Sequence, residues 1–174
     1  AFEQFSARRE ELERLQSQAG AAQVLERTVL KQCGLRPGMQ VLDLACGPGV
    51  VSCLLAEMTL PGQVVGVDIS PELLAEARAN AEKFGVTNLR LQHGDVYALD
   101  FPANQFDFVY ARFLFQHLSA PLQVLQEVAR ILKPGGIVAI ADVDDGWLAL
   151  YPEPDGFMTF TERAATLQAT KGGD

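Results

Sequence analysis

The chain has 174 residues, a net charge of -8 at neutral pH and 48% hydrophobic residues, which is the composition of a single globular domain with its own core. The acidic balance disfavours binding to nucleic-acid phosphates or to an anionic membrane surface, because both partners require a basic face. The sequence shows no apolar run long enough to cross a bilayer and no signal-peptide pattern, and its three cysteines contain no Cys-x-x-Cys pair, so we expect a cytoplasmic protein.

The chain begins with an amphipathic pattern. Apolar residues recur at three- and four-residue steps from about residue 7 to residue 32, which predicts one helix that ends near Gly34. The positions that form its apolar face are Leu12, Leu15, Ala19, Ala22, Leu25 and Val29. A turn at residues 35–38 then leads into the first predicted strand.

A buried strand, a glycine turn and a helix follow one another in VLDLACGPGVV, residues 41–51. The apolar run predicts a central parallel strand, and Gly47 and Gly49 predict a sharp turn. Such a turn directs backbone N–H groups into a crevice, which suits the polar end of a ligand. The glycines alone leave a turn that binds nothing equally open, and Ser52 occupies the place of the third glycine of a dinucleotide fingerprint.

Asp43, inside this strand, distinguishes between the possible ligands. A carboxylate near the end of a buried strand is costly unless it is paired or hydrogen-bonded. It repels a pyrophosphate and attracts a ligand that carries an ammonium or sulfonium group. Asp43 therefore favours S-adenosylmethionine over NAD.

A second strand, residues 64–68, follows the break at residues 60–62. Its last residue, Asp68, lies about twenty residues beyond the glycines, where an acidic residue accepts hydrogen bonds from a ribose diol in nucleotide-binding βαβ units. Ser70 is the expected N-cap of the next helix, which carries a proline and a glutamate in its first turn and ends near Gly85.

The third strand, residues 89–93, alternates polar and apolar residues, which is typical of a strand at the edge of a sheet. His93 falls on its apolar face and is interpreted as structural. Gly94, Asp95 and Val96 follow at the ligand-facing edge, where the carboxylate can accept a hydrogen bond from an amino group such as that of adenine. A plain turn aspartate is the alternative.

The fourth strand is expected over residues 106–110, followed by a loop over residues 111–117. Arg112 and His117 are the candidates in this loop for an anion contact and a base. A surface or capping role is the preferred interpretation of both, and packing in the core is the preferred interpretation of the bulky apolar residues between them.

A further helix begins near Pro121 and is stopped by KPGG at residues 133–136. Its expected buried stripe is Leu122, Leu125, Val128, Ala129 and Leu132. Residues 137–141 then predict a fifth strand that is buried on both faces.

Acidic residues and a last helical pattern follow. Three carboxylates, Asp142, Asp144 and Asp145, lie within four residues and are of the type that binds a divalent cation. We interpret them as a solvated acidic loop and expect no metal. A final helix is expected over residues 157–167.

The order of elements predicts an α/β fold with a doubly wound, mostly parallel sheet and a leading helix. In such a sheet, ligands bind at the carboxyl ends of the strands. This edge is where the predicted turn glycines and most of the acidic candidates lie.

Five motifs in this order resemble the class I S-adenosylmethionine-dependent methyltransferases, in particular the small-molecule branch that includes ubiquinone and menaquinone C-methyltransferases. The motifs are VLDLACGPG (41–49), VGVDIS (65–70), GDV (94–96), FDFV (106–109) and LKPGG (132–136). The resemblance implies a Rossmann-like methyltransferase fold, S-adenosyl-L-methionine as cofactor, S-adenosyl-L-homocysteine as product and a small organic molecule as methyl acceptor.

The resemblance also assigns roles to residues. Asp43 and the loop at residues 45–49 would hold the methionine end of the cofactor. Asp68 would accept hydrogen bonds from both ribose hydroxyls, and Ile69 would lie against the adenine. Asp95 would accept a hydrogen bond from the adenine amino group.

Arg112 would contact the methionine part through its backbone, and the leading helix would lie over the site and contribute Leu15 and Gln18. The complete cofactor-binding set is Asp43, Ala45, Cys46, Gly47, Gly49, Asp68, Ile69, Gly94, Asp95, Val96, Arg112, Leu15 and Gln18. His117 is the candidate catalytic base.

The chain departs from the family pattern near its end, because nothing after Val143 resembles the last two strands, which form an antiparallel hairpin in complete members. We therefore expect one domain in three parts: a leading helix over the cofactor site (1–34), a cofactor-binding core (35–143) and an incomplete substrate region (144–174). Strand five would then be an exposed apolar edge, which favours a homodimer.

The leading hypothesis is a methyltransferase that acts on a small organic acceptor. The alternatives are a truncated, inactive module that binds the cofactor and, with less support, an NAD-dependent oxidoreductase. Asp68 is compatible with NAD, whereas Asp43 and the absent third glycine argue against it.

Overall fold

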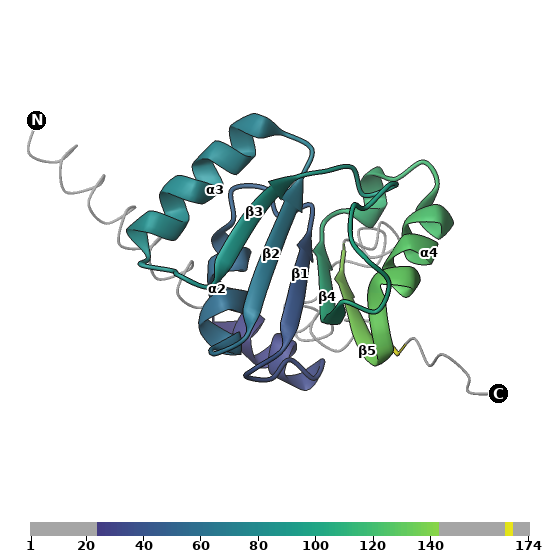
Figure 1. Ribbon diagram of the computed structural model, residues 1–174, viewed down its shortest axis with the longest axis horizontal. Coiled ribbons are helices and arrows are strands. Elements are labelled where there is room, and N and C mark those ends of the chain that lie inside the picture. Colours follow the sequence, from purple (N-terminus) through teal and green to yellow (C-terminus); the bar gives the residue numbers. More distant parts are fainter. Residues whose placement is uncertain (1–23, 143–165, 169–174) are drawn as a thin grey trace, which may run out of the picture.

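The computed structural model describes residues 24–142 and 166–168. They form a six-stranded sheet with the order β3-β2-β1-β4-β5-β6. Figure 1 labels the first five of these strands. The strands are β1 (Gln40–Leu44), β2 (Gln63–Asp68), β3 (Leu89–His93), β4 (Phe106–Arg112), β5 (Leu132–Ala141) and β6 (Thr166–Gln168). Strands β1 to β5 are parallel, which confirms the doubly wound fold and the position of β3 at an edge.

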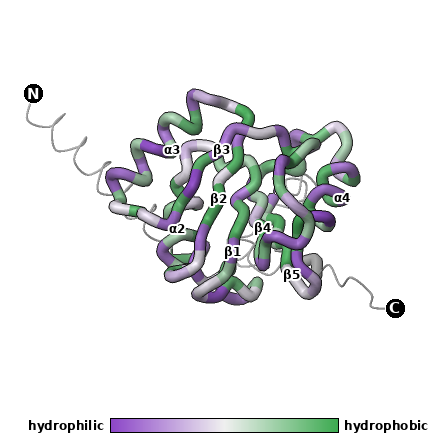
Figure 2. Tube along the Cα trace, viewed as in Figure 1, coloured by the Kyte–Doolittle hydropathy of each residue, from purple (hydrophilic) through white to green (hydrophobic). Residues whose placement is uncertain are grey.

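Helices connect the strands. They are α2 (Val50–Thr59), α3 (Pro71–Lys83), α4 (Pro121–Ile131) and the short 3-10 helix η1 (Phe115–His117), and residues 24–32 are also helical. The Ser70 hydroxyl accepts a hydrogen bond from the Leu73 N–H at the start of α3, as the capping pattern predicts. Helix α3 alternates hydrophilic and hydrophobic positions, whereas the central strands are mainly hydrophobic (Figure 2).

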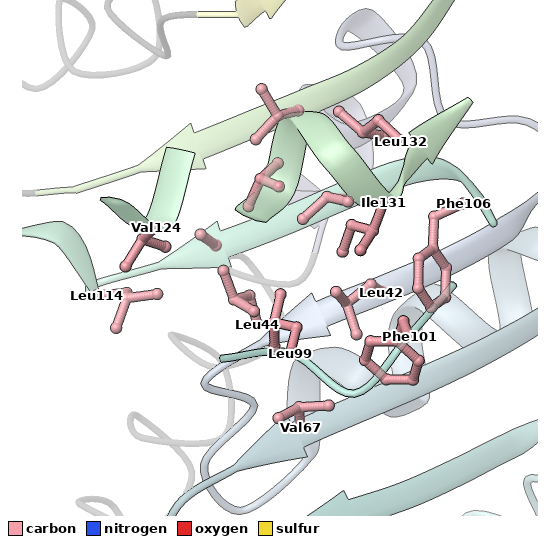
Figure 3. Close-up of a cluster of buried hydrophobic side chains, with 14 residues drawn as sticks. Leu42, Leu44, Val67, Leu99, Phe101, Phe106, Leu114, Val124, Ile131 and Leu132 are labelled. Atoms are coloured by element: carbon pink, nitrogen blue, oxygen red, sulfur yellow. The ribbon is translucent and has the colours of Figure 1, made fainter. Parts of the chain in front are cut away.

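Successive residues of the strands pack on opposite faces of the sheet. Leu42 and Leu44 of β1 pack with Val124 and Ile131 of α4 in one buried cluster (Figure 3). Val41 and Phe108 belong to a second cluster with Leu30, Leu54 and Leu55, which come from the leading helix and α2. The sheet is therefore covered by α4 on one face and by α2 and the leading helix on the other.

The buried stripe of α4 differs from the prediction. Leu122 is 74% exposed and Ala129 is exposed, whereas Val124, Val128 and Ile131 are buried. These three residues stand four and three positions apart and share one helix face, and Leu122 lies two residues from Val124, on the other side of the helix.

Two strands are longer than predicted. Strand β4 continues to Arg112, and β5 begins at Leu132, so that the KPGG segment belongs to the strand instead of preceding it. Residues 133–136 therefore mark the end of α4 but do not form a separate turn. Pairing with β4 from Phe106↔Leu132 onwards, with an irregularity before Phe108, explains this extension.

The prediction for the end of the chain is wrong at two points. Residues Thr166–Gln168 form β6, which pairs antiparallel with Ile137–Ala139, so Leu167 lies in a strand and not in a helix. Strand β5 is consequently not an open edge along this stretch, and the reason for expecting a homodimer there is lost. A parallel edge strand offers a row of N–H and C=O groups, and a segment as short as β6 is enough to pair with three of its residues.

Other predicted features lie outside the described residues. These are Leu15, Gln18, Asp144, Asp145 and the predicted helix up to residue 165. In the described part of the chain, no helix is long and apolar enough to span a membrane.

Candidate functional site

The sheet reverses its winding direction between β1 and β4. In doubly wound sheets, ligands bind in the crevice at this point, outside the carboxyl ends of the strands. Ala45 and Phe113 come directly after these two strand ends, and both have left-handed backbone conformations, with φ of 58° and 53°. Such conformations are rare for residues other than glycine and concentrate at ligand sites. The topology of the sheet and the backbone conformations therefore both indicate a site at the carboxyl ends of β1 and β4.

The loop after β1 is held by a network that includes Asp68. The Cys46 N–H donates to the Val67 carbonyl (2.9 Å), and the Gly47 N–H donates to Oδ2 of Asp68 (2.8 Å). Oδ1 of the same carboxylate accepts from the Ser70 N–H (2.9 Å), and the side chain is only 6% exposed. Asp68 therefore joins the end of β2 to the glycine loop and keeps one acceptor position on each oxygen for a further donor.

The two glycines of this loop have different functions. Gly49 precedes α2 with φ of 72°, and a Cβ atom built on it would lie 2.7 Å from the Cβ of Ala77 in α3. Gly47 has φ of 53°, but nothing lies within 4 Å of its hypothetical Cβ. Gly49 is thus required for helix packing, whereas Gly47 leaves open space beside the loop.

Asp43 is 3% exposed and lies on the α2 face of the sheet, where the Ser52 hydroxyl donates to its Oδ2 (2.6 Å). Burial raises the pKa of Asp43 from its ordinary value of 3.8 to about 6, although the Ser52 hydrogen bond opposes this shift. Glu26 also raises this pKa, and Arg112 lowers it. Ser52 therefore supplies a hydrogen bond to the buried carboxyl of Asp43. The sequence alone indicated only that Ser52 stands in the place of a glycine.

A second polar group on the same face was not predicted from the sequence. The Tyr110 hydroxyl donates to Oε1 of Glu26, and Nε of Arg112 lies 3.7 Å from the other oxygen of that carboxylate. The Arg112 guanidinium lies 4.6 Å above the Phe113 ring. Glu26 comes from the leading helix, and neither its spacing nor its neighbours in sequence indicate contact with β4, so only the tertiary structure reveals this group.

The segment after β3 forms a tight turn. Oδ1 of Asp95 accepts from the Tyr97 N–H (2.9 Å), and the side chain is exposed. This is the turn aspartate that the sequence left as an alternative, and its remaining acceptor positions stay available for a ligand. The Gly94 N–H donates to the Asp68 carbonyl (3.1 Å), which places this turn beside the end of β2. Val96 is partly buried against the core, and Ile69 is 64% exposed.

Tyr97 connects this turn to the beginning of α4. Its hydroxyl accepts from the backbone N–H groups of Ser119 (3.0 Å) and Ala120 (3.3 Å), and these two bonds join segments more than twenty residues apart. The hydrogen bond with the Ser119 side chain, followed by those from the Ala120 and Ser119 N–H groups, holds the pKa of Tyr97 below its usual value. Nothing in the sequence pattern distinguished this tyrosine.

Three further residues make no contact within the described part of the chain that supports direct chemistry. His117 is exposed in η1, and its backbone N–H donates to the Leu114 carbonyl (2.9 Å). His93 is also exposed, which corrects the expectation of an apolar environment. Cys46 is buried, and burial raises the pKa of its thiol to about 12, so it is protonated at neutral pH and is not a nucleophile.

Other features of the described residues lie apart from this site. A cavity of about 270 Å³ lies between α2 and residues 84–88, and none of the predicted site residues lines it. Within the described ranges, no group of three histidine, cysteine or acidic side chains is arranged to hold a metal ion. Asp142 instead accepts a hydrogen bond from the Gln116 N–H (3.1 Å).

Comparison with known proteins identifies the family. A model of the methyltransferase domain matches residues 35–169. The demethylmenaquinone methyltransferase of Listeria welshimeri is 35% identical over 127 residues, which cover 70% of this chain and 54% of the relative. The enzyme of the same name from Staphylococcus aureus is 32% identical over 131 residues, again with 54% of its length covered. The chain thus spans about half the length of the curated relatives it matches.

Solved structures agree with this assignment. An S-adenosylmethionine-dependent methyltransferase from Aquifex aeolicus superposes with a TM-score of 0.64 and 30% identity, over 80% of this chain and 78% of that one. The [4+2]-cyclase SpnF is also similar, with a TM-score of 0.66 and 28% identity over 73% of this chain and 48% of that one. The family match, the sequence relatives and the shared fold together establish that the chain belongs to the class I S-adenosylmethionine-dependent methyltransferases.

Proposed function

We propose that this chain binds S-adenosylmethionine at the carboxyl ends of β1, β2 and β4 and methylates a small organic acceptor. The observation that carries this proposal is the buried Asp43 carboxyl beside the glycine loop. A carboxyl in this position selects against a pyrophosphate and for a cationic ligand. The hydrogen bond from Ser52 uses only one acceptor position of Asp43, and a carboxylate offers about four, so Asp43 can accept further hydrogen bonds from a ligand.

The residues of the site fit the parts of this cofactor. Asp43 and the loop of Ala45, Cys46, Gly47 and Gly49 hold the methionine end. At the other end, Asp68 accepts hydrogen bonds from the ribose hydroxyls. The N–H groups of Gly47 and Ser70 each occupy one acceptor position of this carboxylate, and the remaining positions are used for the ribose.

The adenine lies between two neighbouring segments. Ile69 contributes an exposed apolar surface at the end of β2, and Asp95 accepts from the adenine amino group next to the N–H of Val96. Gly94 brings this turn close to the end of β2 through its bond to the Asp68 carbonyl.

The cofactor supplies an electrophilic methyl group on a sulfonium when it is bound. The contribution of the protein is to orient the reactants and to exclude water. His117 remains the candidate base, and its exposed position in η1 suits a group that meets an acceptor from solvent.

We further propose a function for each part of the chain. Residues 35–143 supply the cofactor site, residues 1–34 cover it with Leu15 and Gln18, and residues 144–174 belong to the substrate region. The names of the relatives favour a small acceptor of the quinone-precursor type. Cys33, Cys46 and Cys53 are buried and form no disulfide, which suits the reducing cytoplasm.

Calorimetric titration with S-adenosylhomocysteine, S-adenosylmethionine and NADH tests this proposal. We expect binding of the first two in the micromolar range and none of NADH. The variant Asp68→Ala should lower the affinity for S-adenosylhomocysteine at least about tenfold, because charge-assisted hydrogen bonds to the ribose are lost. Asp100→Ala removes the same charge from an exposed position and is the matched control.

Each alternative outcome has a separate meaning. Binding of NADH alone would contradict the cofactor assignment and favour the NAD-dependent alternative. Cofactor binding without methyl transfer to any small acceptor would indicate an inactive binding module. Unchanged affinity in Asp68→Ala would remove the ribose assignment.

A further inference from the structure

The side chain of Arg112 lies where the amino-acid end of the proposed cofactor would be held. The register pairs Asp43 with Tyr110 and Leu44 with Ala111, so Arg112 is the next residue of β4, beside Ala45 at the start of the glycine loop. Arg112 and Tyr110 are two residues apart in one strand and share the face of the sheet that carries Asp43. The Arg112 charge lowers the pKa of Asp43, which agrees with this proximity.

The guanidinium is held in place, and its contacts with residues 24–142 leave donors available. Its Nε lies 3.7 Å from Oε2 of Glu26, which is longer than a hydrogen bond, and its Cζ lies over the Phe113 ring. The side chain of Arg112 is 38% exposed. Glu26 is itself fixed by the buried hydroxyl of Tyr110. Arg112 is therefore oriented by two neighbours without being saturated by either.

The charges of this group match those of an amino acid. Of the charges that act on Asp43, Glu26 and Asp68 are acidic and Arg112 is basic. An α-amino acid carries an ammonium, which suits Asp43, and a carboxylate, which requires a cation with a forked set of donors. The exposed guanidinium beside the loop meets this requirement.

We propose that the Arg112 side chain binds the carboxylate of the cofactor's amino-acid end and that Glu26 and Phe113 position it. This inference rests on the proposed function and adds to it, because the family resemblance assigns Arg112 only a backbone contact. It makes Arg112 the residue that distinguishes S-adenosylmethionine from ligands that share its adenosine and sulfonium but lack the carboxylate.

Decarboxylated S-adenosylmethionine provides the direct test, because it differs from the cofactor only by the carboxylate. The affinities of the wild-type protein and Arg112→Gln for both ligands are measured by calorimetry. We expect the substitution to lower the affinity for S-adenosylmethionine about tenfold to a hundredfold, because a charge-assisted bidentate pair is lost. The affinity for the decarboxylated ligand should change less than about threefold, because that ligand makes no bond that Arg112→Gln removes.

Two further variants refine the test. Arg112→Lys keeps the charge but not the fork and should lie between the wild type and Arg112→Gln. Arg90→Gln removes one positive charge from an exposed position on β3 and should change neither affinity. Thermal unfolding of each variant verifies that the protein is folded.

The outcomes separate the two proposals. If Arg112→Gln lowers the affinity for both ligands equally, or does not lower the affinity for S-adenosylmethionine, the role of the Arg112 side chain is overturned. The cofactor assignment remains intact in either case. Failure of the wild-type protein to bind S-adenosylmethionine would overturn the proposed function itself.

Discussion

The loops after β1 and β4 begin in the same way and are stabilised in different ways. Each starts with a left-handed residue, Ala45 or Phe113, at the end of one of two adjacent strands. The first loop is fixed by nearby backbone groups and by the buried carboxylate of Asp68. The second is fixed by the Phe113 N–H, which donates to the Ala141 carbonyl, and by the side chains of distant residues.

This difference determines how visible each loop is in the sequence. Glycines and an aspartate at fixed spacing are a local requirement of the β1 loop, so a motif reveals it. The β4 loop depends on Tyr97, Glu26 and Asp142, which are far from it in sequence. Two loops at one site can thus have equally constrained backbones while only one of them carries a motif.

The largest effect is expected from the substitution Gly49→Ala. It places a Cβ atom 2.7 Å from Ala77 in a left-handed conformation, and the combined strain and overpacking should lower the free energy of unfolding by about 4 kcal/mol. Gly47→Ala shares the left-handed backbone but has open space, so its loss should be about 1 kcal/mol. Urea unfolding measures both, and equal losses would contradict the packing role of Gly49.

The next effect concerns Asp43 and pH. Its pKa is about 6 in the folded protein and 3.8 ordinarily, so between these values the folded state binds more protons than the unfolded state. The free energy of unfolding should therefore fall as pH rises through this window, by about 3 kcal/mol from this group. Asp43→Asn should remove this fall, as measured by urea unfolding from pH 4 to pH 7.

Ser52→Ala sharpens the same test. It removes the hydrogen bond that lowers the pKa of Asp43, so the fall in stability should extend to higher pH than in the wild type. If Asp43→Asn and the wild-type protein lose stability equally with pH, another group must be responsible.

The smallest effect should come from Tyr97→Phe. This substitution removes the acceptor for the N–H groups of Ser119 and Ala120 at a partly exposed position, and its cost should be below that of Gly47→Ala. Hydrogen exchange of these two amides should accelerate, whereas Ser119→Ala should leave the Ala120 amide protected. Unchanged exchange in Tyr97→Phe would show that the tyrosine does not hold the β4 loop.

Local patterns predicted most of the fold. The capping residues gave the start of α3, the apolar runs gave the five parallel strands, and the alternation in residues 89–93 gave the edge position of β3. The prediction failed where distant pairing decided the outcome: β6 replaced the end of an expected helix, and β5 extended through KPGG against β4. A strand of three residues, such as β6, is too short to show an alternation of polar and apolar residues, so it is recognised only by its pairing with β5.

For the candidate site, the sequence alone determined which acidic residues lie at the carboxyl ends of the strands, because their positions follow from the βα order and the parallel sheet. Asp43, Asp68 and Asp95 all belong to this set. The tertiary structure alone decided what each carboxylate contacts and that Glu26, Tyr110 and Arg112 meet beside Asp43. The physical reason is that hydrogen bonds and ion pairs depend on distances between atoms, and residues 84 positions apart, such as Glu26 and Tyr110, acquire a fixed distance only when the chain folds.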